Sequence, residues 1–397
     1  MVRKKFYEKY SLKIISSLAA CSILYSAIPV YANDLNDNVI VEKDNSVLSS
    51  NDQTVCNISE LSLNNNILID SKLKEFYNLD KVRKYIGFDY KVPDYVIPGN
   101  EVHSIRVFNS DDGNNKLELE FSDKNSAKWY SIEAFRGDPV DTLTNEFKES
   151  FEDAIVSTNS KTIDGIQGLY ITLTDSTKYT FAKPESCKYF AWKDGDVWYC
   201  MNYDNNEDGS IGEGEIGKIS NSLKNPKEIV NVNYSIDKEA NGVPKSLINI
   251  YDKDDLNKAT EALGYTPKLP IKINDYIKIS DSFTNIDHMG KSLFSYYSYD
   301  KGTIVFIQTN DNDNYEYEEI SRTGYARENG ETTTVKADKL SIDGMDVYRY
   351  ADKGDNKIVY QWKEDNMYYF FEIYYDNIGI ENVDDIVKEF VDFKPVN

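Results

Sequence analysis

The sequence has few of the residues on which acid–base catalysis and metal binding most often depend. Its 397 residues include two histidines, His103 and His288, and neither lies in a metal-binding spacing such as HExxH. The nucleophile motif G-x-S-x-G is also absent. These absences argue against the commonest hydrolase classes, although a fold can bring distant residues together, and no catalytic residue is assigned. We therefore expect a non-catalytic protein, with a hydrolase that uses an unrecognised carboxylate site as an alternative.

Cysteine is also scarce, with four residues in the chain. Cys21 lies in an apolar N-terminal segment, which leaves Cys56, Cys187 and Cys200, an odd number that is a poor basis for a disulfide framework. Cys187 and Cys200 flank a predicted hairpin that turns at Asp194-Gly195. That turn would place the two thiols diagonally, too far apart for an easy bridge. No obligatory disulfide is expected.

Acidic residues outnumber basic ones outside the first 32 residues. The chain has 45 Lys and Arg against 67 Asp and Glu, a net charge of −22. Residues 1–32 contain five basic residues and one acid, so their removal gives −22 − 4 = −26. Without clustered Lys and Arg, nucleic acid is not expected as a partner. Such a surface also disfavours anionic membranes and is compatible with cations or basic surfaces.

The first 32 residues are typical of a secretory signal peptide. A basic start precedes an apolar stretch over 14–30, and Val30-Tyr31-Ala32 is a small-residue cleavage site after Ala32. Leu18 to Cys21 has the spacing of a lipobox, in which Cys21 would carry a lipid anchor. Because 11 mostly apolar residues follow Cys21, release is favoured. We expect a secreted or cell-surface protein with no membrane span after processing, and lipoprotein anchoring as the alternative.

The remaining chain matches itself at a spacing of 177 residues. The segment "LDKVRKYIGFDYKVP" at 79–93 recurs as "LNKATEALGYTPKLP" at 256–270. Each copy predicts a short amphipathic helix that a glycine closes, followed by a proline that prevents further helix. Residues 216–223 of the first copy and 380–390 of the second have apolar residues at helical spacing, which predicts a closing helix in each.

Later motifs repeat as well. "IDG" at 163–165 recurs at 342–344, and "AWKDGDVWYC" at 191–200 recurs as "QWKEDNMYYF" at 361–370. A domain-sized period with these elements predicts an α+β fold of two homologous domains, each a curved antiparallel sheet with helices at its start and end. The expected organisation is a signal peptide (1–32), a disordered polar leader (33–70), a first repeat domain (71–225), a connector (226–250) and a second repeat domain (251–397).

The repeated motifs G-[FY]-x-x-x-[VL]-P, "IDG" and "WK[DE]" together resemble a bacterial domain-of-unknown-function family. That family is found in exported and anti-sigma-factor-associated proteins of Gram-positive bacteria. The resemblance covers about 71–224 and 251–393, nearly all of the chain after the leader. It implies an extracytoplasmic, non-enzymatic module and supplies no catalytic residues. A nine-residue insertion in the first copy departs from the simple pattern.

The aromatic segment "MYYFFEIYY" at 367–375 is a candidate binding strand. Alternation puts Tyr368, Phe370, Glu372 and Tyr374 on the face opposite the expected core. Aromatic rings beside a carboxylate can bind a sugar, a peptide or another domain, so a cell-surface or cell-wall partner is one hypothesis. The other is that a covering element packs on this face, or that these are ordinary strand-forming tyrosines. An envelope or spore-surface spacer is a further alternative.

The segment "DNNEDGSIGEGE" at 204–215 fits the calcium-loop pattern D-x-[DN]-x-[DN]-G-x5-E. The predicted ligands are the side chains of Asp204, Asn206, Asp208 and Glu215 and the carbonyl of Ser210. The alternative is an acidic solvated loop, because no helix is expected before Asp204. The second copy lacks the motif. We expect one structural calcium ion that orders the closing helix of the first domain.

Overall fold

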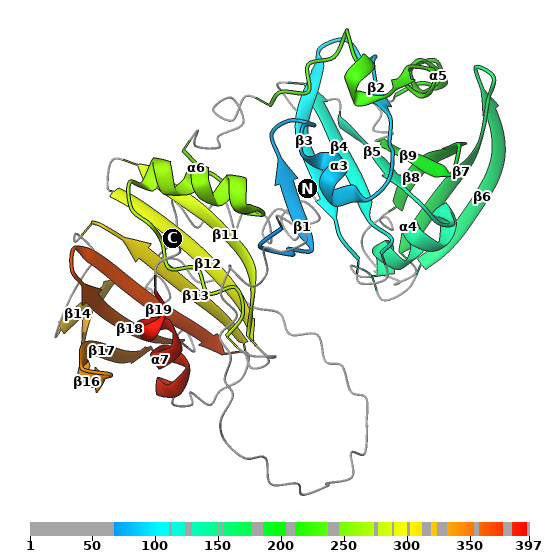
Figure 1. Ribbon diagram of the computed structural model, residues 1–397. Helices are drawn as coiled ribbons and strands as arrows, with labels where there is room; N and C mark the ends of the chain where they lie inside the picture. The colour runs from blue at the N-terminus through cyan, green and yellow to red at the C-terminus, as the bar shows by residue number, and fades with distance from the viewer. Residues whose placement is uncertain are drawn as a thin grey trace, which may run out of the picture. The chain divides into compact units, whose positions relative to one another are not determined.

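The computed structural model describes residues 67–394, except 111–112, 124–128, 149–150, 152–153, 176–185, 204–210, 237–245, 274–276, 288–289, 300–301, 312–318, 324–331, 353–356 and 376–382. The chain divides into two compact units. We call Lys72–Gly242 the first domain, and Val243–Asn397 together with residues 67–71 the second domain. Each is built on one large antiparallel sheet (Figure 1).

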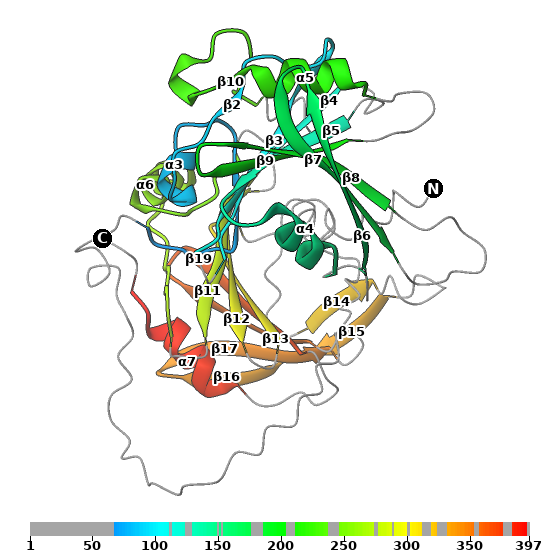
Figure 2. The ribbon, with the colours of Figure 1, turned by 90° about the vertical axis from the view of Figure 1, so that its right-hand side faces the viewer.

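The first domain has an eight-stranded sheet in the order β1-β3-β4-β5-β9-β8-β7-β6. Its strands are β1 (Leu73–Phe76), β3 (Asn100–Phe108), β4 (Lys116–Asp123), β5 (Trp129–Phe135), β6 (Ala154–Ile163), β7 (Ile166–Asp175), β8 (Ser186–Asp194) and β9 (Val197–Tyr203). A separate pair joins β2 (Val92–Pro93) to β10 (Leu223–Lys224). The helices are α3 (Val82–Ile86), α4 (Pro139–Lys148), α5 (Glu213–Asn221) and the 3-10 helix η2 (Pro226–Glu228). Figure 2 shows α4 and α5 on opposite sides of this curved sheet.

The second domain has a seven-stranded sheet in the order β11-β12-β13-β19-β18-β17-β16. Its strands are β11 (Lys278–Asp287), β12 (Gly290–Tyr299), β13 (Gly302–Thr309), β16 (Asp338–Ile342), β17 (Met345–Asp352), β18 (Lys357–Glu364) and β19 (Met367–Tyr375). A hairpin of β14 (Glu319–Thr323) and β15 (Thr332–Lys336) lies between β13 and β16 in the chain. The helices are α6 (Lys253–Leu263) and α7 (Asp384–Asp392).

The two large sheets share one strand order. Seven consecutive neighbours in the first domain, β3-β4-β5-β9-β8-β7-β6, correspond in order to β11-β12-β13-β19-β18-β17-β16 in the second. The first domain has one more strand, β1, at the edge next to β3. In the chain β1 comes before α3, so a strand and not a helix opens this domain. The first domain has α4 between β5 and β6, and the second has β14 and β15 at the corresponding place, between β13 and β16. The protein therefore has two sheet-rich domains in which helices are few.

Both "IDG" motifs form the turn of a β-hairpin. Asp164 and Gly165, which join β6 to β7, have φ of 47° and 85°. Asp343 and Gly344, which join β16 to β17, have φ of 48° and 82°. Two successive residues with positive φ are typical of a two-residue type I′ turn, for which Asp-Gly is a preferred sequence. The Asp-Gly pair of each "IDG" motif is thus explained by the positive φ angles that a two-residue hairpin turn requires.

The β8–β9 hairpin turns one residue later than expected. Asp194 pairs with Val197, so Gly195 and Asp196 form the turn, and Gly195 takes the left-handed conformation with φ of 64°. Glycine adopts this conformation without steric cost, which fixes the turn at that position. In the observed register Cys200 lies opposite Ala191, away from Cys187 along the strands, and Cys200 is a free thiol.

The apolar residues Leu68 and Ile69 belong to the second domain, although the polar leader was expected to run to residue 70. Ile69 has no solvent exposure, and the backbone N–H of Leu68 donates to the carbonyl of Tyr251 over 2.9 Å. Both side chains join a core that also contains Trp362 and Phe390. Their burial is the physical reason for the shifted boundary, because apolar side chains are stabilised when they leave water.

The start of the expected connector folds onto the first domain. The backbone N–H groups of Val230 and Asn231 donate to Asp94 Oδ1 over 2.9 and 2.7 Å, and the Tyr234 hydroxyl donates to the Pro93 carbonyl. Lys224 Nζ lies 2.6 Å from Asp94 Oδ2. These contacts, the one with Lys224 above all, hold the pKa of Asp94 well below its ordinary value. Asp94 is therefore the anchor of this segment.

Candidate functional site

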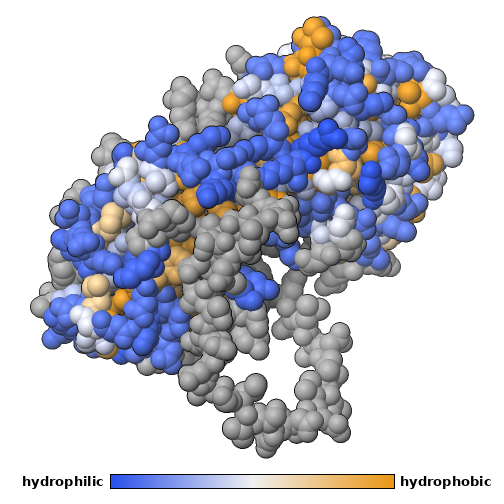
Figure 3. Space-filling view, in the orientation of Figure 1, coloured by the Kyte–Doolittle hydropathy of each residue, from blue (hydrophilic) through white to orange (hydrophobic). Residues whose placement is uncertain are grey.

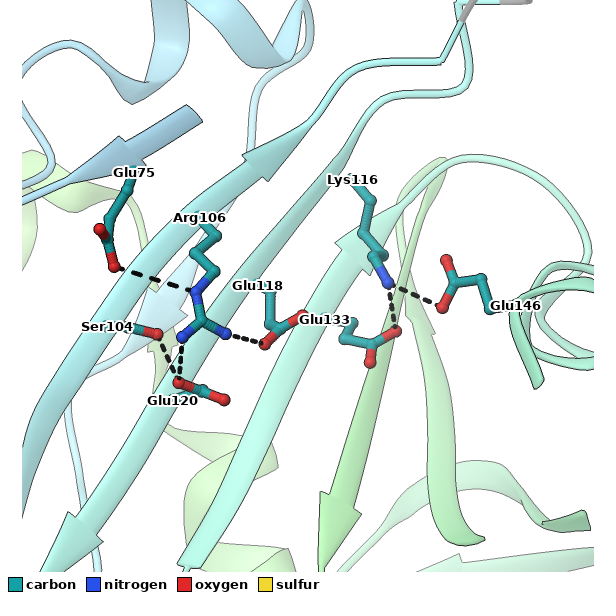
Figure 4. A network of polar contacts seen from close by, with 8 residues as sticks. All are labelled: Glu75, Ser104, Arg106, Lys116, Glu118, Glu120, Glu133 and Glu146. Carbon is teal, nitrogen blue, oxygen red and sulfur yellow. Dashed lines mark hydrogen bonds and ion pairs between the residues drawn. The ribbon is translucent and has the colours of Figure 1, made fainter. Parts of the chain in front are cut away.

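Seven polar residues of the first-domain sheet and one of helix α4 form a network of polar contacts (Figure 4). Its members, which we call the charge network, are Glu75, Ser104, Arg106, Lys116, Glu118, Glu120, Glu133 and Glu146. On β4 the charged residues alternate with Leu117 and Leu119, which are buried on the opposite face. The strand alternation thus places one row of charges on the face that α4 covers.

Arg106 occupies one half of the network. Its guanidinium lies 3.2 Å from Glu118, 3.0 Å from Glu120 and 4.0 Å from Glu75. The Ser104 hydroxyl donates to Glu120 over 2.6 Å. The Arg106 side chain is only 16% exposed. The surrounding carboxylates raise the pKa of Arg106 although burial acts in the opposite direction, so its charge is fixed at any physiological pH.

Lys116 occupies the other half, between two elements. Its Nζ lies 3.4 Å from Glu133 on β5 and 2.7 Å from Glu146 on α4. Burial raises the pKa of Glu133 to about 8, although the nearby Lys116 acts in the opposite direction. Burial likewise raises the pKa of Glu118, which is the direct cross-strand neighbour of Glu133. Near neutral pH this half of the network therefore holds a proton on a carboxyl group.

The network ties together elements that are distant in sequence. It joins β1, β3, β4 and β5 to one another and to α4 through side-chain bonds. Cys200 on β9 is the next cross-strand neighbour of Glu133. Burial raises the pKa of the Cys200 thiol well above its ordinary value, and a protonated buried thiol is a poor nucleophile. The arrangement is therefore suited to holding a sheet together and to binding a proton.

Most of the predicted calcium loop lies outside the described residues, namely Asp204, Asn206, Asp208 and Ser210. Glu215 is described and lies in the first turn of α5. Its carboxylate accepts a hydrogen bond from the Tyr95 hydroxyl over 2.6 Å and lies 2.9 Å from Lys218 Nζ. Among the described residues, no group of three or more His, Cys, Asp or Glu is arranged to hold a metal ion.

The aromatic residues predicted to bind a ligand lie on the face of β19 opposite the main core of the second domain. Tyr368 and Phe370 are 8% and 9% exposed and pack with Ile307, which leaves little of either ring to contact a ligand. The Tyr374 hydroxyl donates to Glu372 over 2.6 Å, and Lys357 Nζ lies 3.2 Å from the same carboxylate. Both faces of this strand are therefore largely buried.

Cys21 and Ala32, the residues of the two expected processing sites, also lie outside the described residues. No helix within the described ranges is long and apolar enough to cross a membrane. The face of the protein seen in Figure 3 is mainly hydrophilic, with small hydrophobic patches, in keeping with the acidic composition.

The charge network is the feature that sequence reasoning missed. Its signal is the stretch "KLELEF" at the start of β4, where Lys116, Glu118 and Glu120 alternate with apolar residues. Such alternation is typical of a strand with one solvated face. Only the pairing of β3, β4 and β5, together with Glu146 supplied by α4, brings Arg106 and Lys116 against these carboxylates.

Comparison with known proteins gives only distant similarities. No family model matches the chain, and no curated protein matches it. A crystal structure from Bacteroides thetaiotaomicron VPI-5482 is 13% identical, covers 54% of this chain and 88% of its own, and has a TM-score of 0.19. MucB in complex with MucA(peri) is 8% identical, covers 69% of this chain and 86% of its own, and has a TM-score of 0.15. Similarities at these TM-scores carry no argument about function.

Proposed function

We propose that residues 33–397 form an exported, non-catalytic binding or interaction protein of the cell surface or extracellular space. The signal-peptide pattern of residues 1–32 supports export. The two domains are proposed to be copies of one unit, because their sheets share one strand order. Each copy is proposed to have a helix near its start and another at its end. The resemblance to a family of exported bacterial modules points the same way.

The observation that carries the non-catalytic part is the pairing within the charge network. Arg106 contacts Glu75, Glu118 and Glu120, and Lys116 contacts the remaining carboxylates of the network. These ion pairs connect the strands of the sheet to one another and to α4. Buried charges that are paired in this way stabilise one arrangement of the fold, since removing one partner leaves the other uncompensated.

Binding to surface material tests this proposal. Purified residues 33–397 are incubated with cell walls and with intact cells of the source bacterium, which are then sedimented. We expect saturable co-sedimentation that high salt weakens, because the protein is strongly acidic. An unrelated acidic protein of similar size is the matched control. If the protein stays in the supernatant as completely as the control, the binding function is contradicted.

A calcium ion in the first domain remains part of the proposal. The loop of 204–215 would supply the ligands, and Glu215 at the start of α5 would close the shell from both carboxylate oxygens. Glu215 is already anchored by Tyr95 and Lys218. Bound calcium would replace Lys218 as the cation beside this carboxylate and so fix the loop to the helix. Its role is structural, and the weak affinity of extracellular sites would suffice.

Two alternatives have their own tests. A hydrolase would most reasonably use Glu118 and Glu133, which are cross-strand neighbours whose pKa values burial raises. Turnover of cell-wall polysaccharides or peptides that Glu133→Gln abolishes would establish it.

A spacer of the envelope or spore surface would instead be found assembled in those structures, without saturable binding. Fractionation of vegetative cells, spores and medium separates the spacer from a released binding protein.

A further inference from the structure

Strand β6 forms one edge of the first-domain sheet (Figure 1). It is ten residues long, and eight consecutive residues of it, 155–162, are exposed. The described residues include three exposed large hydrophobic side chains, and two of them are neighbours on this strand, Ile155 at 59% and Val156 at 38%. A long exposed edge of this kind is a template for pairing with another strand.

The turn that follows β6 determines which of its backbone groups face outward. Ile163 and Ile166 flank the two-residue turn and are paired, so they form the hydrogen-bonded pair that closes such a hairpin. Hydrogen-bonded and non-hydrogen-bonded pairs then alternate along an antiparallel ladder. The register of β6 and β7 has no bulge. The N–H and C=O groups of Val156, Thr158, Ser160 and Thr162 therefore point away from β7.

The other sheet edges differ from β6. The outer edge of β11 is engaged by residues 248–250, because Ile250 N–H donates to Ser282 and Thr284 N–H donates to Ile248. At the opposite edge of the first domain, β1 has four residues. The counterpart of β6 in the second domain, β16, has five. Among the edges that the structure describes, β6 thus offers the longest row of outward backbone groups.

The chemistry of the strand indicates its occupant. Lys161 is the single charged residue in β6, and the strand contains no acid although the chain carries 67. Lys161 Nζ lies 2.9 Å from Glu213, and its side chain remains 41% exposed. An antiparallel strand beside β6 would begin near Lys161 and end near Ile155 and Val156. A complementary segment is therefore acidic in its first half and apolar in its second.

We infer that β6 binds an extended segment of another protein by β-strand addition, with an acidic first half and an apolar second half. This inference rests on the proposed binding function and names a surface and a partner class for it. Main-chain hydrogen bonds would supply affinity, and the side chains around Lys161 and Ile155 would supply selectivity. A second copy that pairs through its own β6 fits less well, because that strand contains no acid to face Lys161.

A designed peptide tests the inference. The probe is a fluorescent ten-residue peptide, capped at both ends, that alternates threonine with glutamate in its first half and with valine in its second. Binding to residues 33–397 is measured by fluorescence anisotropy. We expect saturable binding, which weakens by about tenfold when lysines replace the glutamates. Two further peptides are N-methylated, one at every odd-numbered amide and the other at every even-numbered amide. Only one of these two sets of N–H groups faces β6 in an added strand, so only one of the two peptides should lose binding.

Matched variants of β6 complete the test. Thr158→Pro removes an outward N–H without breaking the ladder to β7 and should weaken peptide binding by about tenfold or more. Thr158→Val keeps that N–H and should bind like the wild type. If folded Thr158→Pro binds normally, or if both N-methylated peptides bind equally, the inference is wrong. If Thr158→Pro does not fold, the N-methylated peptides decide.

Two further outcomes separate this inference from the proposed function. Sedimentation equilibrium that shows a wild-type dimer, lost in Thr158→Pro, would mean that the occupant is a second copy and would overturn the inference. Absence of peptide binding, combined with normal co-sedimentation on cell walls, would overturn the strand-addition site and leave the proposed function standing. Absence of cell-wall binding, combined with peptide binding, would overturn the proposed cell-wall binding and leave the strand-addition site standing.

Discussion

Lys91 Nζ lies 2.5 Å from Asp194 Oδ2 in the first domain, and the repeat-equivalent residues Lys268 and Glu364 form the matching ion pair in the second. Each lysine precedes the proline that follows an opening helix, and each acid ends a "WK[DE]" hairpin strand. Two motifs that are about 100 residues apart in sequence therefore meet in one contact. This contact explains why both motifs recur in both halves of the chain.

The two ion pairs should differ in their contribution to stability. Lys268 is fully buried and also donates to the Val391 carbonyl over 3.0 Å, whereas Lys91 is 38% exposed. Lys268→Met should lower the free energy of unfolding by about 3 kcal/mol, because it leaves a carboxylate and a carbonyl without their cation. Lys91→Met should cost about 1 kcal/mol or less. Urea denaturation of both variants makes the comparison, and equal losses would contradict it.

The charge network should make stability depend on pH. Because the pKa of Glu133 is raised from 4.5 to about 8, the folded protein retains a proton between these values that the unfolded chain releases. The stabilising effect of that proton is complete below the unfolded pKa and is lost as pH rises through the folded pKa. Stability should therefore fall between about pH 4.5 and pH 8, by an amount on the order of a few kcal/mol.

Glu133→Gln should flatten this part of the stability profile, since glutamine does not titrate. Urea midpoints at pH 5, 6.5 and 8, each relative to the wild type, measure the effect. Glu146→Gln, which changes the more exposed partner of Lys116, is the matched control and should retain the slope. A Glu133→Gln protein with the wild-type slope would show that another group holds the proton.

Calcium should stabilise the first domain through the loop at 204–215. The melting temperature of residues 33–397 should be higher in millimolar calcium than in chelator, because a ligand that binds only the folded state stabilises it. Asp204→Ala and Glu215→Gln should remove the difference. Lys218→Gln should strengthen calcium binding a few-fold, since it removes the cation that lies 2.9 Å from Glu215. Identical melting in calcium and chelator would refute the site.

Substitution on β19 separates packing from ligand binding. Phe370 is 9% exposed, and Phe370→Ala should cost about 3 kcal/mol of stability through loss of packing. Tyr374→Phe removes the hydrogen bond to Glu372 and should cost about 1 kcal/mol. Calorimetry measures both losses. A folded Tyr374→Phe protein that no longer co-sediments with cell walls would instead assign this tyrosine to a binding site.

Local signals in the sequence were informative where the backbone itself sets the requirement. The glycines expected to close the opening helices, Gly87 and Gly264, do end them in the left-handed conformation, with φ of 79° and 77°. The repeated "IDG" motif is noted in the sequence only as a repeat, and its role as a hairpin turn comes from the structure. The position of the β8–β9 turn was off by one residue, because Asp194-Gly195 and Gly195-Asp196 are both acceptable turn pairs and only the ladder distinguishes them.

Long-range features could not be predicted in the same way. Arg106 and Lys116 meet their carboxylates across strand pairs and a helix, so the charge network depends on register and on where α4 packs. The alternation on β4 gives no information about either. The openness of β6 is likewise a property of its place at the end of the strand order.

Export is the central claim, and the N-terminus of the accumulated protein tests it most directly. Cells are separated into cytoplasm, membrane, wall and medium, and the protein in each fraction is characterised by intact mass and N-terminal sequencing. We expect a chain that begins at Asn33 and is found in the wall or the medium, and we expect Cys21→Ser to leave it unchanged. A chain that retains residues 1–32 and stays in the cytoplasm would contradict it.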